Sequence, residues 1–587
     1  MKRFLYILPV VVIIIFFVVS CSDGAPFASY RFELVSVRKP DTNIYTWIFA
    51  DLNGDSKDEF IYSSSEVPSF HHTMVGDLDI KVYSQINTGH PIRAIVALKH
   101  PADGKSWLFY TFNDGRKVYL NSALYEWTDP LQRVDRAFEL IPRKDSRIDD
   151  PSLEWFAAIV PIKIDDLDGD GRYELICRTT DSFTSNPRGI VVYDLETGSI
   201  KWQLDLPAVS YTLLVEDFTG DGKKEILYGT LAFKNNNFIM HDVDDHNGWI
   251  VLVNAEGKIL SNQKTFTGYG GNYLVAADLN HDGNPQVIKL EATWGVADTR
   301  NSVQIMHWDG NGFRSQKSYS IESSFIRSQH NFFVEVDDLG TYRMFCASKS
   351  KGLILLDHEL NEVAHSFADN IINVWPSGDL RGKGRKDTII QTEDNRFVLL
   401  DYNARLLASL PNPFPEENRL NVSIVLNGFG KQRLVAINTP SQVRYYRIKP
   451  LPLMDLIYGY IHHYRKLINI LVLACIILLG LHLYHIKSLL YKTIGSIPSG
   501  IMLIGGKTRI IFTNAILKSL LQPQQPIKPG KRLDVLMPEV FRLLMHMQET
   551  HSSLYTHPIA YKPNGAEASY NLTIVKVGGI YLNHIII

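Results

Sequence analysis

The sequence predicts a mainly β protein: a β-propeller of seven blades, or of eight, joined through a transmembrane helix to a small α+β domain. Three observations predict it. An acidic loop alternates with β-hairpins through residues 27–450, two runs are almost purely apolar, and the last ninety residues or so alternate strand-like and helix-like stretches.

Composition is that of an ordinary globular protein. Hydrophobic residues make up 45% of the 587 residues and charged residues 21%, which excludes a disordered or collagen-like chain. The net charge of -2 gives no basic field of the kind that binds nucleic acid, so no nucleic-acid partner is expected.

The N-terminal segment, residues 1–21, reads as an export signal. Lys2 and Arg3 precede an apolar run from Phe4 to Val19. The run ends in Ser20-Cys21, which resembles the lipobox of bacterial lipoproteins and implies lipidation at Cys21. An uncleaved N-terminal anchor is the alternative. Either reading places the following segment outside the cytoplasm.

Internal repeats fill the exported part. Acidic loops begin at Asp51, Asp166, Asp217 and Asp278, and degenerate copies lie at residues 337–340, 379–387 and 427–430. Apolar hairpins such as Ile190–Trp202 and Ile250–Leu260 alternate with them. Most loops recur every ~40 to 60 residues, which suits one four-stranded blade each. Seven loops predict seven blades. The longer interval after Asp51 holds either a large insertion or an eighth blade near Trp107–Asn121.

These loops resemble the FG-GAP/VCBS repeats, the propellers of integrin α-subunits and many bacterial surface proteins. The resemblance covers roughly residues 27–448 and implies that the loops bind Ca²⁺ in a structural role. Carboxylates at loop positions 1, 3, 5 and 9 suit a hard cation that takes six to eight oxygens. The ligands carried over, in order of preference, are Asp166, Asp168, Asp170 and Glu174; Asp51, Asn53, Asp55 and Glu59; Asp217, Thr219, Asp221 and Glu225; and Asp278, Asn280 and Asp282.

Other readings of the loops stay open. In the Asp278 loop, Gln286 stands where the other loops carry their last carboxylate. In the Asp379 loop, Arg381 and Lys383 fall at ligand positions, so no cation is expected in that loop. Asp and Gly also form tight turns without any metal.

Cys177 and Cys346 lie in apolar strand-like runs, which favours two buried thiols over a disulfide.

The second apolar run, Leu467–Tyr484, is long enough at about 27 Å to span a bilayer core, and we expect a transmembrane helix over residues 466–485. Export of the preceding part predicts that residues 22–465 are extracytoplasmic and residues 486–587 cytoplasmic, at a bacterial cytoplasmic membrane. Residues 486–496 have helical spacing and are expected to continue this helix.

The tail, residues 497–587, resembles a PAS domain. Ile497–Leu521 reads as strand, glycine turn, strand and short helix, with Asn514 as the helix cap. We expect a further helix near Val540–Gln548 and strands near Ser553–Tyr561, Glu567–Val577 and Ile580–Ile587. The resemblance implies dimerisation or signal relay. Haem ligation by His546, His551 or His557 is the weaker alternative.

The domain order predicts a membrane sensor. The propeller would bind an extracytoplasmic carbohydrate, peptide or protein, and the tail would relay to a cytoplasmic partner such as a kinase, as a homodimer. No output module is recognised, so either the chain is a truncated sensor or its output is a separate protein. The alternative is a cell-surface adhesion scaffold. An enzyme is not expected, because the quinone-dehydrogenase-like hairpin Asp194–Trp202 occurs once and no catalytic pair is recognised.

Overall fold

The structure is a computed structural model that describes residues 28–586. Not described are residues 41–42, 65–71, 129, 144–154, 181–186, 294–300, 322–331, 337–341, 349–351, 367–370, 377, 384, 418–419, 427–432, 498, 506–508, 522–528, 537, 550–553, 562–567 and 578–583. The chain divides into two compact units, Met1–Tyr460 and Ile461–Ile587, and each is described by itself. Cys21 lies outside the described residues.

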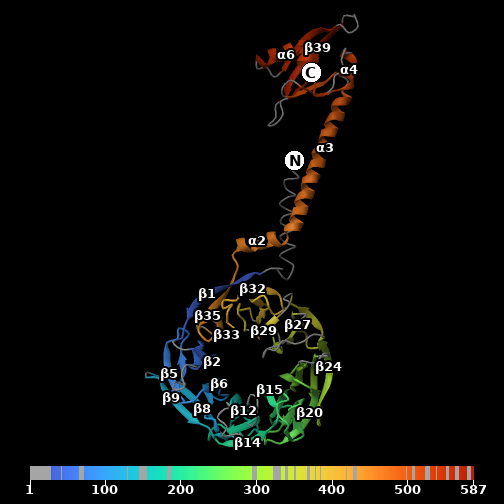
Figure 1. The fold of residues 1–587 in the computed structure, drawn as a ribbon. Helices are drawn as coiled ribbons and strands as arrows, with labels where there is room; N and C mark the ends of the chain where they lie inside the picture. The colour runs from blue at the N-terminus through green and yellow to red at the C-terminus, as the bar shows by residue number, and fades with distance from the viewer. Residues whose placement is uncertain are drawn as a thin grey trace. The chain divides into compact units, whose positions relative to one another are not determined.

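The first unit is a β-propeller, which confirms the predicted fold class (Figure 1). Blade 1 contains β2 (Ile44–Ala50), β3 (Glu59–Ser64), β4 (His72–Gly76) and β5 (Val82–Asn87), and blade 2 contains β6 (Ile92–Lys99), β7 (Ser106–Asn113), β8 (Lys117–Glu126), β9 (Gln132–Ala137) and β10 (Ile141–Pro142). Blade 3 contains β11 (Ala158–Asp165), β12 (Glu174–Thr180), β13 (Gly189–Asp194) and β14 (Ile200–Asp205), and blade 4 contains β15 (Val209–Glu216), β16 (Glu225–Ala232), β19 (Asn247–Val253) and β20 (Ile259–Thr267).

The second half of the ring repeats this pattern. Blade 5 contains β21 (Gly270–Ala277), β22 (Gln286–Thr293), β23 (Asn301–Trp308) and β24 (Phe313–Ile321), and blade 6 contains β25 (Phe332–Val336), β26 (Tyr342–Ser348), β27 (Gly352–Leu356) and β28 (Glu362–His365). Blade 7 contains β29 (Ile371–Pro376), β30 (Thr388–Thr392), β31 (Arg396–Leu400) and β32 (Leu406–Pro411), and blade 8 contains β33 (Asn421–Leu426), β34 (Arg433–Asn438), β35 (Val443–Pro450) and β1 (Tyr30–Arg38). A two-stranded ribbon, β17 (Ile239–Met240) with β18 (Val243–Asp244), lies between β16 and β19.

Blades 4 and 5 are joined into one eight-stranded sheet where Leu231 and Ala232 of β16 pair with Gly271 and Gly270 of β21. Counted by their four-stranded units, the described residues form eight blades, and the count of seven acidic loops was one too few. The missed sheet, β6 to β10, contains Trp107–Asn121, which confirms the eighth-blade alternative over an insertion. Its first turn, His100–Lys105, lacks the repeated acidic pattern, so counting loops could not find it.

The first and last strands of the propeller segment close the ring. β1 is the outermost strand of blade 8 and pairs antiparallel with β35, from Tyr30 opposite Pro450 to Arg38 opposite Val443. A blade cannot bury both of its faces alone, so neighbouring blades must cover each other. The cores of the described ring lie between successive blades. One of them joins blade 1 to blade 8 through side chains such as Phe60 and Tyr445.

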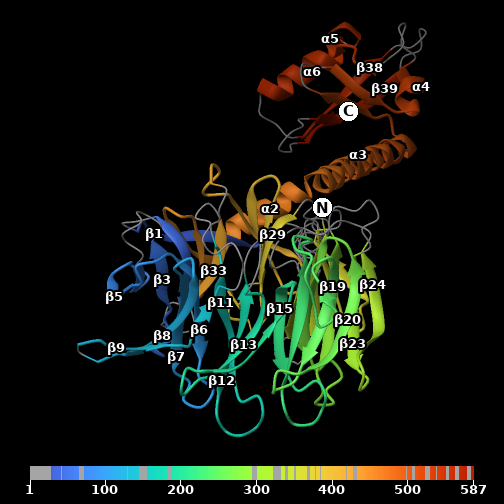
Figure 2. The same cartoon turned by 60° about the horizontal axis from the view of Figure 1, so that its bottom comes forward.

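The strand sequences explain which strands are central. β12 and β13 carry nearly continuous apolar residues and are buried on both faces, whereas the outer strand β24 exposes a polar run. The predicted hairpins pair as β13 with β14 and β19 with β20. Figure 2 shows the strands of each blade standing side by side around the ring. Cys177 and Cys346 are buried in β12 and β26, and neither forms a disulfide.

The remaining elements are helices and a second sheet. α2 (Leu453–His463) is followed by the 32-residue α3 (Arg465–Ser496), and the stretch Ile468–Ser496 is by length and composition the one described helix able to cross a membrane. The C-terminal part of the second unit contains β36 (Met502–Gly505), β37 (Arg509–Thr513), α4 (Ala515–Leu521), α5 (Leu533–Leu536), α6 (Pro538–Glu549), β38 (Leu554–Tyr561), β39 (Ala568–Val577) and β40 (His584–Ile586). Its five strands form one antiparallel sheet in the order β37-β36-β40-β39-β38.

Candidate metal centres in the acidic loops

Each acidic loop connects the first strand of a blade to the second and holds its own shape. In the Asp166 loop, the carboxylate of Asp166 accepts the N–H groups of Gly169 at 2.8 Å and Gly171 at 2.9 Å. The glycines adopt φ of 76° and 84°, where a side chain would be strained. In the Asp217 loop, the carboxylate of Asp217 accepts the corresponding two N–H groups. Turn hydrogen bonds alone therefore bring the acidic side chains together.

The side chain at loop position 9 points back into the loop. Glu174 accepts the N–H of Leu167 at 2.9 Å, and Glu225 accepts that of Phe218 at 2.9 Å. This contact places the side chain at position 9 beside the side chain at position 3. The charges of these two side chains therefore set the net charge inside the loop.

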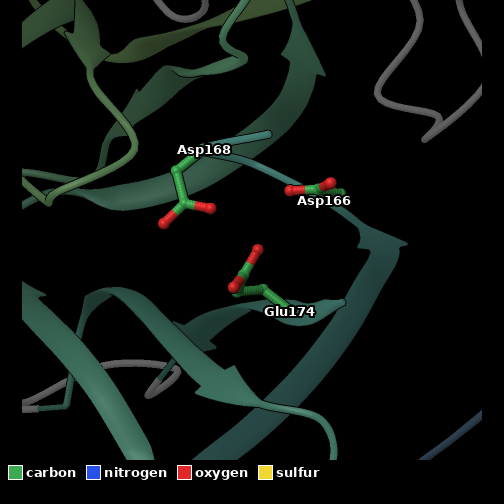
Figure 3. A group of neighbouring side chains, drawn as sticks. All are labelled: Asp166, Asp168 and Glu174. Carbon is green, nitrogen blue, oxygen red and sulfur yellow. The ribbon is translucent and has the colours of Figure 1, made fainter. Parts of the chain in front are cut away.

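Two of the predicted groups have metal-site geometry. In each, one carboxylate oxygen per residue lies within 4.8 Å of the others; the groups are Asp166, Asp168 and Glu174 (Figure 3), and Asp217, Asp221 and Glu225. Oxygens bound to one Ca²⁺ at 2.3–2.6 Å are separated by at most about 5 Å, so both groups fit the ion by distance. Asp170 is not a member of the first group and instead binds the Arg172 side chain at 2.8 Å.

A lysine from another strand contacts the first group. The Lys201 ammonium on β14 donates to Asp168 at 2.9 Å and to Glu174 at 2.6 Å. Burial, which lowers the pKa of Lys201, is outweighed by these two carboxylates, and the pKa is raised. Lys201 thus supplies the positive charge that a metal ion would otherwise supply.

The Asp217 group has no such partner among the described residues. Lys223 pairs with Glu256 and Lys224 with Asp165, so neither lysine contacts the group. Glu225 is 2% exposed, and burial raises its pKa, with a further contribution from Asp221. A buried carboxylate with a raised pKa and acidic neighbours is stabilised by a cation.

The Asp51 loop has similar electrostatics with fewer carboxylates. Glu59 accepts the Leu52 N–H at 2.8 Å and the Asn53 side-chain amide at 3.0 Å. Burial, together with Asp55 and Asp51, raises the pKa of Glu59 to about 7.

Two further loops satisfy the same position without a metal. In the Asp278 loop, Gln286 donates its amide to Asn280 at 2.9 Å, a neutral pair. In the Asp379 loop, Arg381 binds Asp387 at 2.9 Å, a pairing that the sequence did not predict. In the Asp278 loop, the predicted ligand Asp282 accepts the side-chain amide of Asn280 at 2.8 Å. The degenerate loops at residues 337–340 and 427–430 lie outside the described residues.

Comparison with known proteins adds similarity of fold only. No protein-family model matches the chain, and no curated protein matches it. Among solved structures, BamB from Moraxella catarrhalis is 13% identical with a TM-score of 0.37, covering 71% of this chain and 99% of its own. Sqt1 from Chaetomium thermophilum is 9% identical with a TM-score of 0.46, covering 71% and 99%. At these values the propeller assignment rests on the sheet order above.

Proposed function

We propose that the chain is a membrane-bound sensor, in which an extracytoplasmic propeller binds a ligand and a cytoplasmic PAS-like domain relays the signal to a separate output protein such as a kinase. One observation carries the proposal: α3 runs without a break from the apolar span into the C-terminal domain. A rigid helix of this kind transmits displacement between its two ends.

Contacts at the end of α3 support this coupling. The Tyr491 ring of α3 stacks on Phe512 of β37, with centroids 5.0 Å apart and an interplanar angle of 5°. Asn514 is 2% exposed and donates to the Ser499 carbonyl at 2.7 Å, while its own side-chain oxygen accepts the N–H of Leu517 at 3.0 Å and caps α4. Movement of the helix end would therefore reach both the sheet and α4.

The family assignments are part of the proposal. The strands, α4 and α6 of the C-terminal domain follow the order expected of a PAS-like unit, and we assign residues 497–587 to it as a homodimerising relay. The acidic loops support the FG-GAP/VCBS assignment of residues 27–450. The side chains of His546, His551 and His557 lie outside those described, and haem is not proposed.

For the metal, we propose structural Ca²⁺ at the Asp217 loop first and the Asp51 loop second. The Asp166 loop, which the sequence ranks first, falls to third because Lys201 already neutralises its carboxylates. Asp217, Asp221 and Glu225 would hold the ion as carboxylate ligands. Its chemistry there is charge neutralisation of a turn, and the role proposed for the propeller is binding rather than catalysis.

Topology is the direct test. A phosphatase that is active only outside the cytoplasm is fused after Ile587, and in a matched chain after Pro452. We expect no activity from the first fusion and full activity from the second, with the converse pattern for a fluorescent protein that folds only in the cytoplasm. An active phosphatase after Ile587 would refute the sensor topology.

A cell-surface adhesion scaffold is the second candidate. The closed ring favours it, because the first and last strands of the propeller, β1 and β35, pair in blade 8 and the propeller forms its own compact unit. Deleting residues 486–587 separates the two functions. Unchanged surface binding together with an unchanged transcriptional response to ligand would support the scaffold and refute the sensor.

A further inference from the structure

Basic side chains gather in the loop that follows β29 of blade 7. Arg381 and Lys383 stand where other blades carry acidic ligands, and Arg385 and Lys386 follow them in the same loop. Arg381 is held by Asp387, and Lys386 pairs with Glu335. Lys383 and Arg385 are exposed, and neither pairs with a carboxylate in the described part of the chain. These two cations are therefore available to an anionic partner.

This loop lies beside the corner where the chain enters the propeller before Tyr30 and leaves it after Pro450. The Tyr30 ring, at the start of β1, lies 5.5 Å from the Arg381 guanidinium and 5.9 Å from the Lys383 ammonium. Tyr30 pairs with Pro450, the last residue of β35. The neighbouring N–H of Leu451 donates to the Ser29 carbonyl at 2.9 Å. The basic loop is thus fixed to the point from which the chain continues toward both apolar runs.

Both connections to those runs are short. Eight residues separate Cys21 from Tyr30 in the sequence, and the nine steps between them reach at most ~30 Å. On the other side, α2 begins at Leu453, and its eleven residues extend about 16 Å. Leu453 and Met454 are 68% and 72% exposed. A helix that shows apolar side chains to solvent next to a membrane span is stabilised at the bilayer interface.

We propose that Lys383 and Arg385, with the apolar side of α2, dock blades 7 and 8 onto anionic phospholipid headgroups of the membrane that carries α3. The proposal rests on the membrane topology proposed above. The short connections keep the two cations near the surface. The corresponding loops of blades 3 and 4 lie on the far side of the ring from blades 7 and 8, so docking is confined to one edge of the ring.

The test measures how fast the Lys383 amine is acylated in the full chain, reconstituted in nanodiscs of phosphatidylcholine alone or of phosphatidylcholine and phosphatidylglycerol at roughly 7:3. Lys223, in the corresponding loop of blade 4, is the internal control. We expect acylation of Lys383 to slow about fivefold in the anionic discs and to recover in about 0.5 M NaCl. Lys223 should react equally in both. The variant Arg385→Glu should lose most of the protection, and the matched variant Lys258→Glu in blade 4 should keep it.

The outcomes separate the two proposals. A chain that does not insert into nanodiscs refutes the membrane topology and the docking with it. A chain that inserts, but whose Lys383 reacts at the same rate in both lipids, refutes only the docking. Equal protection in neutral and anionic discs, insensitive to salt, would show that anionic headgroups are not the partner.

Discussion

Replacing Glu59 by glutamine should stabilise the metal-free protein at about pH 8 and have no effect at acid pH. The Glu59 carboxylate is 4% exposed, and its pKa is raised from 4.5 to about 7 by burial and by Asp55 and Asp51. Between these two values the folded state keeps a proton that the unfolded state has lost, so stability falls as pH rises through this window and the loss is complete above it.

The magnitude follows from the size of this shift. A pKa raised by about 2.5 units corresponds to roughly 3 kcal/mol of lost stability at high pH, an upper bound for a carboxylate near solvent. Glutamine does not ionise, and Gln286 already fills the corresponding position in blade 5, where it accepts the Leu279 N–H at 2.7 Å. For a ring of ~420 residues, 3 kcal/mol shifts the melting temperature by about 3 °C.

The assay is thermal unfolding of the full chain in detergent with a chelator, at about pH 8 and about pH 4.5, compared with Glu174→Gln as the matched control. Glu174 is paired with Lys201, so the control removes an ion-pair partner and should lower stability by about 1–3 kcal/mol. If Glu59→Gln lowers the melting temperature at the higher pH, or raises it equally at both, the reasoning fails. If the Asp51 loop binds Ca²⁺, the added ion should raise the melting temperature of Glu59→Gln less than that of the wild type, because the Asp217 loop remains intact in both.

Three further changes test the other contacts. Lys201→Met should destabilise the metal-free chain by about 2 kcal/mol, because it leaves Glu174 buried beside other carboxylates. Ca²⁺ should then raise the melting temperature of Lys201→Met by more than that of the wild type, and an equal rise in both would argue against a metal in that loop. Arg381→Met should cost about 3–5 kcal/mol by leaving Asp387 unpaired, and adding Asp387→Asn should recover most of it in the same melts. Asn514→Ala should cost about 2 kcal/mol and abolish ligand response with insertion intact, whereas normal signalling would argue against coupling through this residue.

Much of the propeller could be predicted because its signals are local. The Asp-x-[Asn/Asp]-x-Asp-Gly pattern specifies a turn through hydrogen bonds within six residues, and apolar runs specify buried strands. The Asn514 cap and the continuous helix through residues 486–496 were also predicted correctly, since both depend on neighbours in sequence. The blade containing Trp107–Asn121 was left open because its turn does not carry the repeated motif.

The sequence by itself determined the ring, the acidic loops and the apolar segments. Only the tertiary structure decided which loops have an uncompensated negative charge. Lys201 lies 27 residues beyond Glu174 and reaches it because β14 is placed beside the loop, whereas Glu225 has no such lysine in the described chain. The same packing placed Lys383 against Tyr30 at the corner where the chain leaves the ring. Charge balance in a folded protein depends on contacts between distant residues, and no local motif encodes them.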